Sequence, residues 1–120
     1  MKLKIYCFQD SKSMYEEAEK FDEKLVIDGG SHSDLMNTVL DIVKKGCEKP
    51  IFALREEFVL LIGNAIFWQK IMAENVELYF CEDGEMKQSA YLENGMIRDD
   101  FPLGYFMGNY KEFVSKLKEI

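Results

Sequence analysis

The sequence predicts one α+β domain, in which a mainly antiparallel sheet packs with about three helices. Its 120 residues, 48% of them apolar, suit one domain with a substantial core. The first half alternates strand and helix patterns as βαβα, a β-meander follows, and the last residues have helical spacing. We find no repeat, low-complexity tract or linker, so residues 1–120 are expected to form a single unit.

The amino-terminal segment predicts a strand and then a helix. Residues 2–8 alternate polar and apolar side chains with the period of a strand. Ser13 and Glu16 match a capping box, in which each side chain bonds to a backbone N–H of the other residue. We therefore expect the first helix over about residues 13–21.

A second strand and helix are predicted over residues 24–46. Residues 24–27 are a short apolar run, and the glycines of Asp28-Gly29-Gly30-Ser31 indicate a turn. Large apolar side chains then recur at helical spacing opposite a polar face. Ser31 or Ser33 can cap this helix, and Gly46 can end it.

Residues 51–98 predict most of the antiparallel sheet. Gly63-Asn64 is a possible hairpin turn into a strand at 65–68, and the alternative is a helix over 65–73, which the hydrophobic period does not exclude. Glu82-Asp83-Gly84-Glu85 predicts a second hairpin turn. The other expected strands are 51–54, 58–62, 76–81, 86–92 and, more briefly, 96–98.

The last twelve residues predict a third helix. Asn109 is a suitable cap, with Glu112 at the matching third position. We expect Phe113 and Leu117, on its apolar face, to pack against the sheet.

Composition restricts the classes of partner and site. The formal net charge of −7 disfavours direct binding of nucleic acid or of anionic membranes and favours a basic protein partner. Three well-separated cysteines, without a CxxC motif and with a single histidine, do not form a zinc-binding pattern. We expect no metal, no cofactor and a reducing, cytoplasmic location. The composition does not indicate the oligomeric state.

The loop before the second helix is the first candidate site. Gly29, Gly30, Ser31 and His32 open a helix whose free N–H groups can hold an anion. The loop is neither a dinucleotide-binding fingerprint nor a P-loop, and a turn with a helix cap explains it more simply.

His32 also raises the possibility of catalysis. It would act as general base with Asp28 or Asp34 and a flanking serine. Neighbours at a helix start point in different directions, however, so we assign no catalytic residue and favour a binding protein over an enzyme. A small enzyme or ligand-binding protein that uses this loop remains the alternative.

One short segment is similar to a known family. Val26-Ile27-Asp28-Gly29, with Asp34-Leu35 and Leu40, resembles the opening of barstar-type ribonuclease inhibitors over less than a fifth of the chain. The aromatic, acidic helix that those inhibitors present to their target does not follow, so no residue role is carried over.

The candidate partner-binding residues are acidic. Glu82, Asp83 and Glu85 surround one predicted turn, and Asp99 and Asp100 follow the next strand, so antiparallel pairing would gather both groups at one end of the sheet. Tyr105 belongs to an aromatic stretch, from Phe101 to Tyr110, that either packs in the core or forms a recognition surface.

The favoured hypothesis is an acidic binding module, such as an immunity protein or inhibitor that neutralises a basic toxin or nuclease. A third hypothesis is an acidic mimic of nucleic acid that occupies a binding groove directly.

Overall fold

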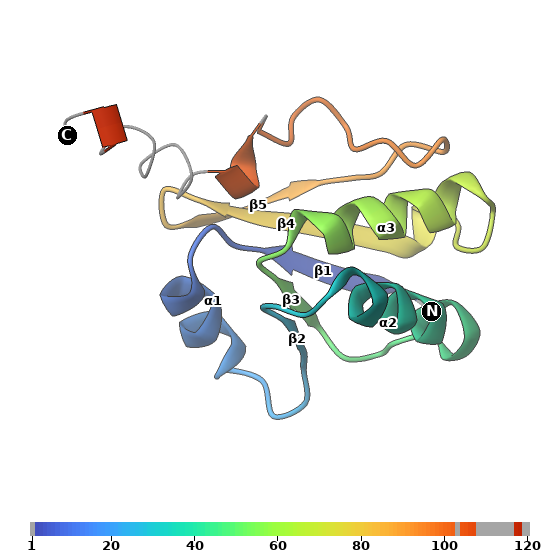
Figure 1. The fold of residues 1–120 in the computed structure, drawn as a ribbon, viewed down its shortest axis with the longest axis horizontal. Helices are drawn as coiled ribbons and strands as arrows, with labels where there is room; N and C mark the ends of the chain where they lie inside the picture. The colour runs from blue at the N-terminus through green and yellow to red at the C-terminus, as the bar shows by residue number, and fades with distance from the viewer. Residues whose placement is uncertain (1, 103, 108–116, 119–120) are drawn as a thin grey trace.

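The computed structural model describes residues 2–102, 104–107 and 117–118, which form one domain (Figure 1). Two single turns of 3₁₀ helix, Ala73–Asn75 and Tyr105–Met107, accompany the main elements. In chain order these are β1 (Leu3–Cys7), α1 (Ser11–Ala18), β2 (Leu25–Ile27), α2 (His32–Lys45), β3 (Ile51–Ala53), α3 (Glu56–Phe67), β4 (Val76–Glu82) and β5 (Glu85–Ser89).

The five strands form one mixed sheet in the order β2-β3-β1-β4-β5. The pairs β2–β3, β3–β1 and β1–β4 are parallel, and only β5 runs antiparallel to its neighbour. A single domain built from helices and a sheet is therefore confirmed. The expected antiparallel arrangement is wrong, because a helix returns the chain between β3 and β4 and makes these strands parallel.

That helix, α3, is the main departure from the sequence-based expectation. Residues 58–62 form its first half instead of a strand, and Gly63-Asn64 lies inside it instead of forming a hairpin turn. The alternative helix over 65–73 overlaps only its last turn. The helix has an apolar side chain in almost every direction because it packs against the sheet and α2, while a later hairpin crosses it. An apolar run without a polar face has no helical period to detect.

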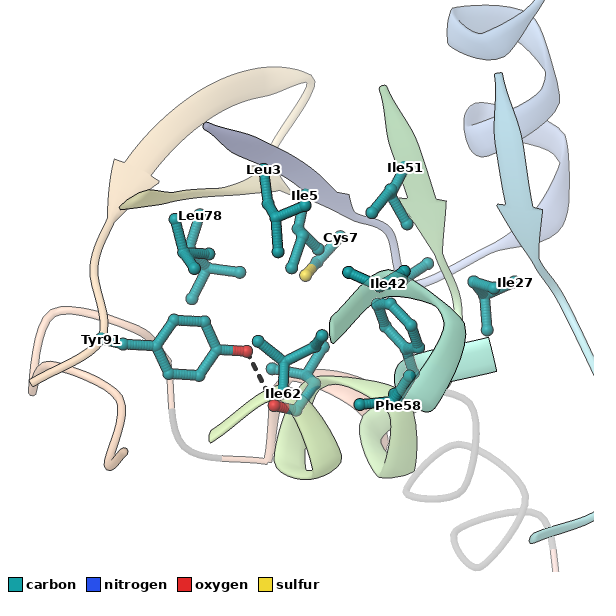
Figure 2. Close-up of a cluster of buried hydrophobic side chains, with 14 of the residues drawn as sticks. Leu3, Ile5, Cys7, Ile27, Ile42, Ile51, Phe58, Ile62, Leu78 and Tyr91 are labelled. Atoms are coloured by element: carbon teal, nitrogen blue, oxygen red, sulfur yellow. Dashed lines mark hydrogen bonds between the residues drawn. The ribbon is translucent and has the colours of Figure 1, made fainter. Parts of the chain in front are cut away.

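The two faces of the sheet bury separate cores. Successive side chains of a strand point to opposite faces. Ile51 and Ala53 thus join the larger core with α2 and α3 (Figure 2), whereas Phe52 packs with Met14 and Ala18 of α1. In the larger core, the Tyr91 hydroxyl donates a 2.7 Å hydrogen bond to the Val59 carbonyl of α3.

The helix ends follow the capping patterns in part. Ser31 caps α2, in a capping box with Asp34, and Gly46 ends it, as expected. Helix α1 begins earlier than predicted, because its cap is Asp10 and not Ser13. The Asp10 carboxylate accepts a 2.8 Å hydrogen bond from the Ser13 backbone N–H, so Ser13 lies in the first turn.

The chain after β5 folds back over α3. Tyr91 and Ile97 form an antiparallel bridge, which confirms the expected brief pairing. At the crossing, a Cβ atom added to Gly63 would lie 2.4 Å from the Gly95 carbonyl oxygen, so both glycines are required for this approach.

The expected carboxy-terminal helix lies mostly outside the described residues, Phe113 included. Leu117 is described, and 52% of its surface is exposed. None of the described helices is long and apolar enough to cross a membrane.

Candidate functional site

The parallel strands direct four chain segments to one edge of the sheet, at the left in Figure 1. This carboxyl edge consists of residues 8–12, 28–34, 54–57 and 81–87. The neighbouring strands β1 and β3 lead into helices on opposite faces, α1 on one and α3 on the other. Open sheets of parallel strands commonly bind their ligands at such a point.

The carboxyl edge is strongly acidic. It carries eight carboxylates against three cationic side chains, Lys12, Arg55 and Lys87, and the single histidine. The carboxylates come from every segment of the edge: Asp10, Asp28, Asp34, Glu56, Glu57, Glu82, Asp83 and Glu85.

Three of these carboxylates hold the edge together. Asp10 caps α1, and Asp34 accepts a 3.0 Å hydrogen bond from the Ser31 backbone N–H. The Ser31 backbone and hydroxyl groups lower the pKa of Asp34. Asp28 accepts a hydrogen bond from the Tyr15 hydroxyl, which raises the pKa of Tyr15. These groups therefore fix loops as well as supplying charge.

The candidate anion loop already contains its own negative group. The Asp34 carboxylate accepts a hydrogen bond from the Ser31 backbone N–H. The Ser31 hydroxyl accepts one from the Asp34 backbone N–H at 3.2 Å. Arg55 donates a 3.0 Å hydrogen bond to the Gly30 carbonyl and so ties the loop to the end of β3. A carboxylate at the helix start repels a second anion, so this geometry disfavours phosphate binding at Gly29 and Gly30.

His32 pairs with a different residue from those that the sequence indicated. Its Nδ1 atom contacts the Glu57 carboxylate of α3, and Arg55 lies 3.5 Å from that carboxylate. Within the described part of the chain, His32 makes no hydrogen bond to either flanking serine. Its side chain is 64% exposed. This pair joins the first turns of α2 and α3 but contains no activated nucleophile.

The structure places Glu82, Asp83 and Glu85 together on the turn between β4 and β5, at the carboxyl edge. Glu82 forms a 2.9 Å salt bridge with Lys87. Asp83 and Glu85 are exposed, and no salt bridge to either is present among the described residues. These two carboxylates are therefore available to a partner.

Asp99 and Asp100 do not join that turn. Asp100 accepts hydrogen bonds from the Ser89 hydroxyl at 2.6 Å and from Arg98, which together lower its pKa to about 2. Ser89 is the last residue of β5, four residues from Glu85, or roughly 13 Å along a strand. The pairing register therefore separates Asp100 from the acidic turn.

Tyr105 is 3% exposed, so it positions the edge from within. Its hydroxyl lies 2.9 Å from the Cys7 carbonyl and 2.6 Å from the Cys81 carbonyl, and it accepts from the Cys81 N–H at 3.1 Å. Gln9 donates to the Tyr105 carbonyl at 3.0 Å. Burial raises the pKa of Tyr105. Tyr105 thus fastens the segment before it to the ends of β1 and β4.

The aromatic stretch is part of the core as far as it is described. Phe101, Tyr105 and Phe106 pack edge to face or stacked against one another, and the first two also contact Phe80. Tyr110 lies outside the described residues.

Sequence reasoning missed a surface feature, a groove of about 440 Å³ between α3 and residues 96–102 and 104–106. Leu60 on one wall and Met96 on the other are more than half exposed. Leu60 and Met96 line the same groove because residues 56–67 form a helix, whereas the sequence pattern predicts a strand over residues 58–62.

Comparisons with protein-family models, with curated proteins and with solved structures find no match to this chain. Among the described residues there is no group of three or more histidine, cysteine, aspartate or glutamate side chains arranged to hold a metal ion.

Proposed function

We propose that this chain is an acidic binding module that occupies the surface of a basic protein, as an immunity protein or inhibitor occupies a toxin or nuclease. The carboxyl edge carries the proposal, because strands that are far apart in sequence bring eight carboxylates to one end of the domain.

Electrostatic complementarity is the physical reason. A protein that grips phosphate groups presents lysine and arginine side chains there, and an opposing acidic surface raises the rate of encounter. The carboxylates at the helix starts are held by backbone hydrogen bonds, so binding does not have to order them. Asp83 and Glu85 are free of intramolecular salt bridges in the described structure and are the first candidates for intermolecular pairs.

The alternative of a small enzyme or anion-binding protein has less support. Asp34 occupies the start of α2, and the exposed pair of His32 and Glu57 lies beside no activated nucleophile in the described residues. A basic protein is attracted by the same carboxylates that repel an anionic substrate.

The test starts from the protein that co-purifies with this chain in its source organism, or from the product of the adjacent reading frame. Its affinity is measured by titration calorimetry at about 50 mM and 500 mM salt. We expect Asp83→Lys with Glu85→Lys to weaken binding by about tenfold or more and to reduce its dependence on salt, since charged pairs at an interface have this effect.

The matched control is Glu48→Lys with Glu74→Lys, two exposed glutamates remote from the carboxyl edge. Equal weakening by both double variants would show that only net charge matters. Affinity independent of both variants and of salt would refute the proposal.

A further inference from the structure

The groove between α3 and residues 96–102 and 104–106 has apolar walls and an acidic rim. Val59, Leu60 and Met96 contribute to the walls, and Phe101 and Tyr105 lie deeper toward the sheet. Leu60 is 52% exposed and Met96 64% exposed, so each wall presents a large apolar side chain to solvent.

The walls of the groove are held in place by contacts along its length. The Tyr91 hydroxyl bonds to the Val59 carbonyl at 2.7 Å, and the backbones of Gly63 and Gly95 touch where the hairpin crosses α3. Tyr105 fastens the other wall to the ends of β1 and β4. A groove that is formed before binding does not require a partner to order it.

The rim of the groove is negative. Glu56 lies on the α3 wall and Asp99 on the opposite wall, and neither forms a salt bridge among the described residues. The one cation of the lining, Arg98, is paired with Asp100 at 2.6 Å. The groove therefore combines apolar side chains with two exposed carboxylates that no salt bridge among the described residues neutralises.

We propose that this groove receives an apolar side chain of the basic partner, flanked there by lysine or arginine residues that reach Glu56 and Asp99. The inference rests on the proposed function, and it adds a docking position and the chemistry of the docking segment. Glu56 belongs to both the groove and the carboxyl edge, so the two surfaces are continuous.

The dimensions and charge favour this occupant. A volume of about 440 Å³ is within the range of ligand pockets and exceeds that of one large side chain. Binding energy at protein interfaces is concentrated in a few apolar or aromatic anchors that fill such pockets, surrounded by a polar rim. The two carboxylates repel phosphate, so a nucleic acid or an anionic lipid surface does not fit.

The probe is a synthetic helical peptide of about 14 residues with leucine and tryptophan on one face and lysine on the other. A second peptide carries glutamate in place of each lysine. Fluorescence anisotropy with the whole chain is expected to show that the lysine peptide binds at least about tenfold more tightly.

Two double variants locate the binding site. Leu60→Ser with Met96→Ser should weaken binding of the lysine peptide by about tenfold or more, because these exposed side chains would contact the anchor. The control is Met36→Ser with Leu40→Ser, two half-exposed side chains of α2 outside the groove, and it should change affinity less than about twofold. Circular dichroism and urea unfolding confirm that both variants fold.

The outcomes separate this inference from the proposed function. Equal effects of the two double variants, or equal binding of the two peptides, would overturn the docking of a basic segment in the groove. Binding of anionic lipid vesicles that is lost only with the Leu60 and Met96 changes would also overturn it, in favour of a lipid surface. The reversal of Glu48 and Glu74, two exposed residues outside the groove lining, should leave peptide affinity within about twofold. Loss of partner binding when Asp83 and Glu85 are reversed would support the acidic module, whereas the peptide measurements with the Leu60 and Met96 variant test the groove.

Discussion

The two edges of the sheet are made by the same strands but carry opposite charge. The carboxyl edge has eight carboxylates and three cationic side chains. The opposite, amino edge, made by residue 2 and residues 19–24, 44–50, 68–75 and 90–93, has seven lysines and six carboxylates. Each helix connects parallel strands, so helices start at the carboxyl edge and end at the amino edge. Helix dipoles favour acids at starts and lysines at ends.

This comparison separates charge that the fold explains from charge that it does not. Glu56 and Glu57 in the first turn of α3, and Lys44 and Lys45 in the last turn of α2, follow the dipole rule. The turn between β4 and β5 has no helix, yet it adds Glu82, Asp83 and Glu85 to the same edge. Asp83 has φ of +53° and precedes Gly84, so it suits the hairpin turn itself, and Glu82 pairs with Lys87. Glu85 is therefore the acid of this turn that neither the backbone conformation nor a salt bridge among the described residues explains.

The edges also differ in their apolar surface. Tyr105 contacts the carboxyl ends of β1 and β4 on the α3 side, and it also lines the groove. At the amino edge, Phe67, Trp68 and Met72 are exposed by 56%, 70% and 60%. The later part of the chain thus forms a second layer that reaches both edges. Tyr105 contacts the carboxyl ends of β1 and β4, and Gly95 contacts Gly63 in the second half of α3.

The largest effect is expected where that layer crosses α3. Gly95 has φ of +85°, and a Cβ there would lie 2.0 Å from the Gly63 carbonyl oxygen. Gly95→Ala should therefore lower the free energy of unfolding by about 3 kcal/mol, through backbone strain and the clash together. Urea unfolding followed by circular dichroism measures this.

Gly84, on the acidic turn, is the matched control. Its φ is +77°, but nothing lies within 4 Å of an added Cβ. Gly84→Ala should cost about 1–2 kcal/mol, from the left-handed backbone alone. If the two variants lose the same stability, the crossing does not hold the second layer in place.

A smaller effect is expected from Tyr105→Phe, which removes the hydroxyl that joins the ends of β1 and β4. The Cys81 N–H then lacks this acceptor, and the loss should be about 1–3 kcal/mol in the free energy of unfolding. Tyr79→Phe is the control, because within the described part of the chain its hydroxyl bonds to the nearby Glu77 side chain alone. Equal stability of the Tyr105 variant and the native chain would mean that apolar packing alone holds this segment.

The smallest effect concerns pH. The hydrogen bonds from Arg98 and Ser89 lower the pKa of Asp100 from 3.8 to about 2 in the folded chain. A lowered folded pKa stabilises the protein above the unfolded pKa, and this contribution is lost as pH falls from about 4 through 2. Asp100→Asn should therefore reduce the loss of stability between about pH 5 and pH 2.5, measured by urea unfolding. Asp99→Asn is the control, because Asp99 forms no salt bridge among the described residues, and it should leave the loss of stability over this pH range unchanged.

Sequence patterns located most local elements. The alternation in β1, the apolar runs of β2 and β3, the capping box of α2 and the hairpin of β4 and β5 are all recognisable, because each signal comes from neighbouring residues. The acidic turn at Glu82, Asp83 and Glu85 was also predictable, because turn residues are a local signal. Its role in binding stays a prediction.

Contacts between distant residues were not predictable in this way. His32 meets Glu57 only because α2 and α3 lie side by side, and Asp100 meets Ser89 because of the register of β5. A pattern of neighbouring residues in one sequence contains no information about such pairs, because each residue by itself is an ordinary surface group.

The sequence by itself determined a single acidic domain, most of its strands, the capped helix α2 and the acidic turn. Only the tertiary structure decided that α3 is a helix and that four strands are parallel. The reason is that α3 is covered on several sides, which removes the polar face that marks a helix, while strand direction depends on pairing between distant segments. Once the strands are parallel, their carboxyl ends meet, and the scattered carboxylates become one surface.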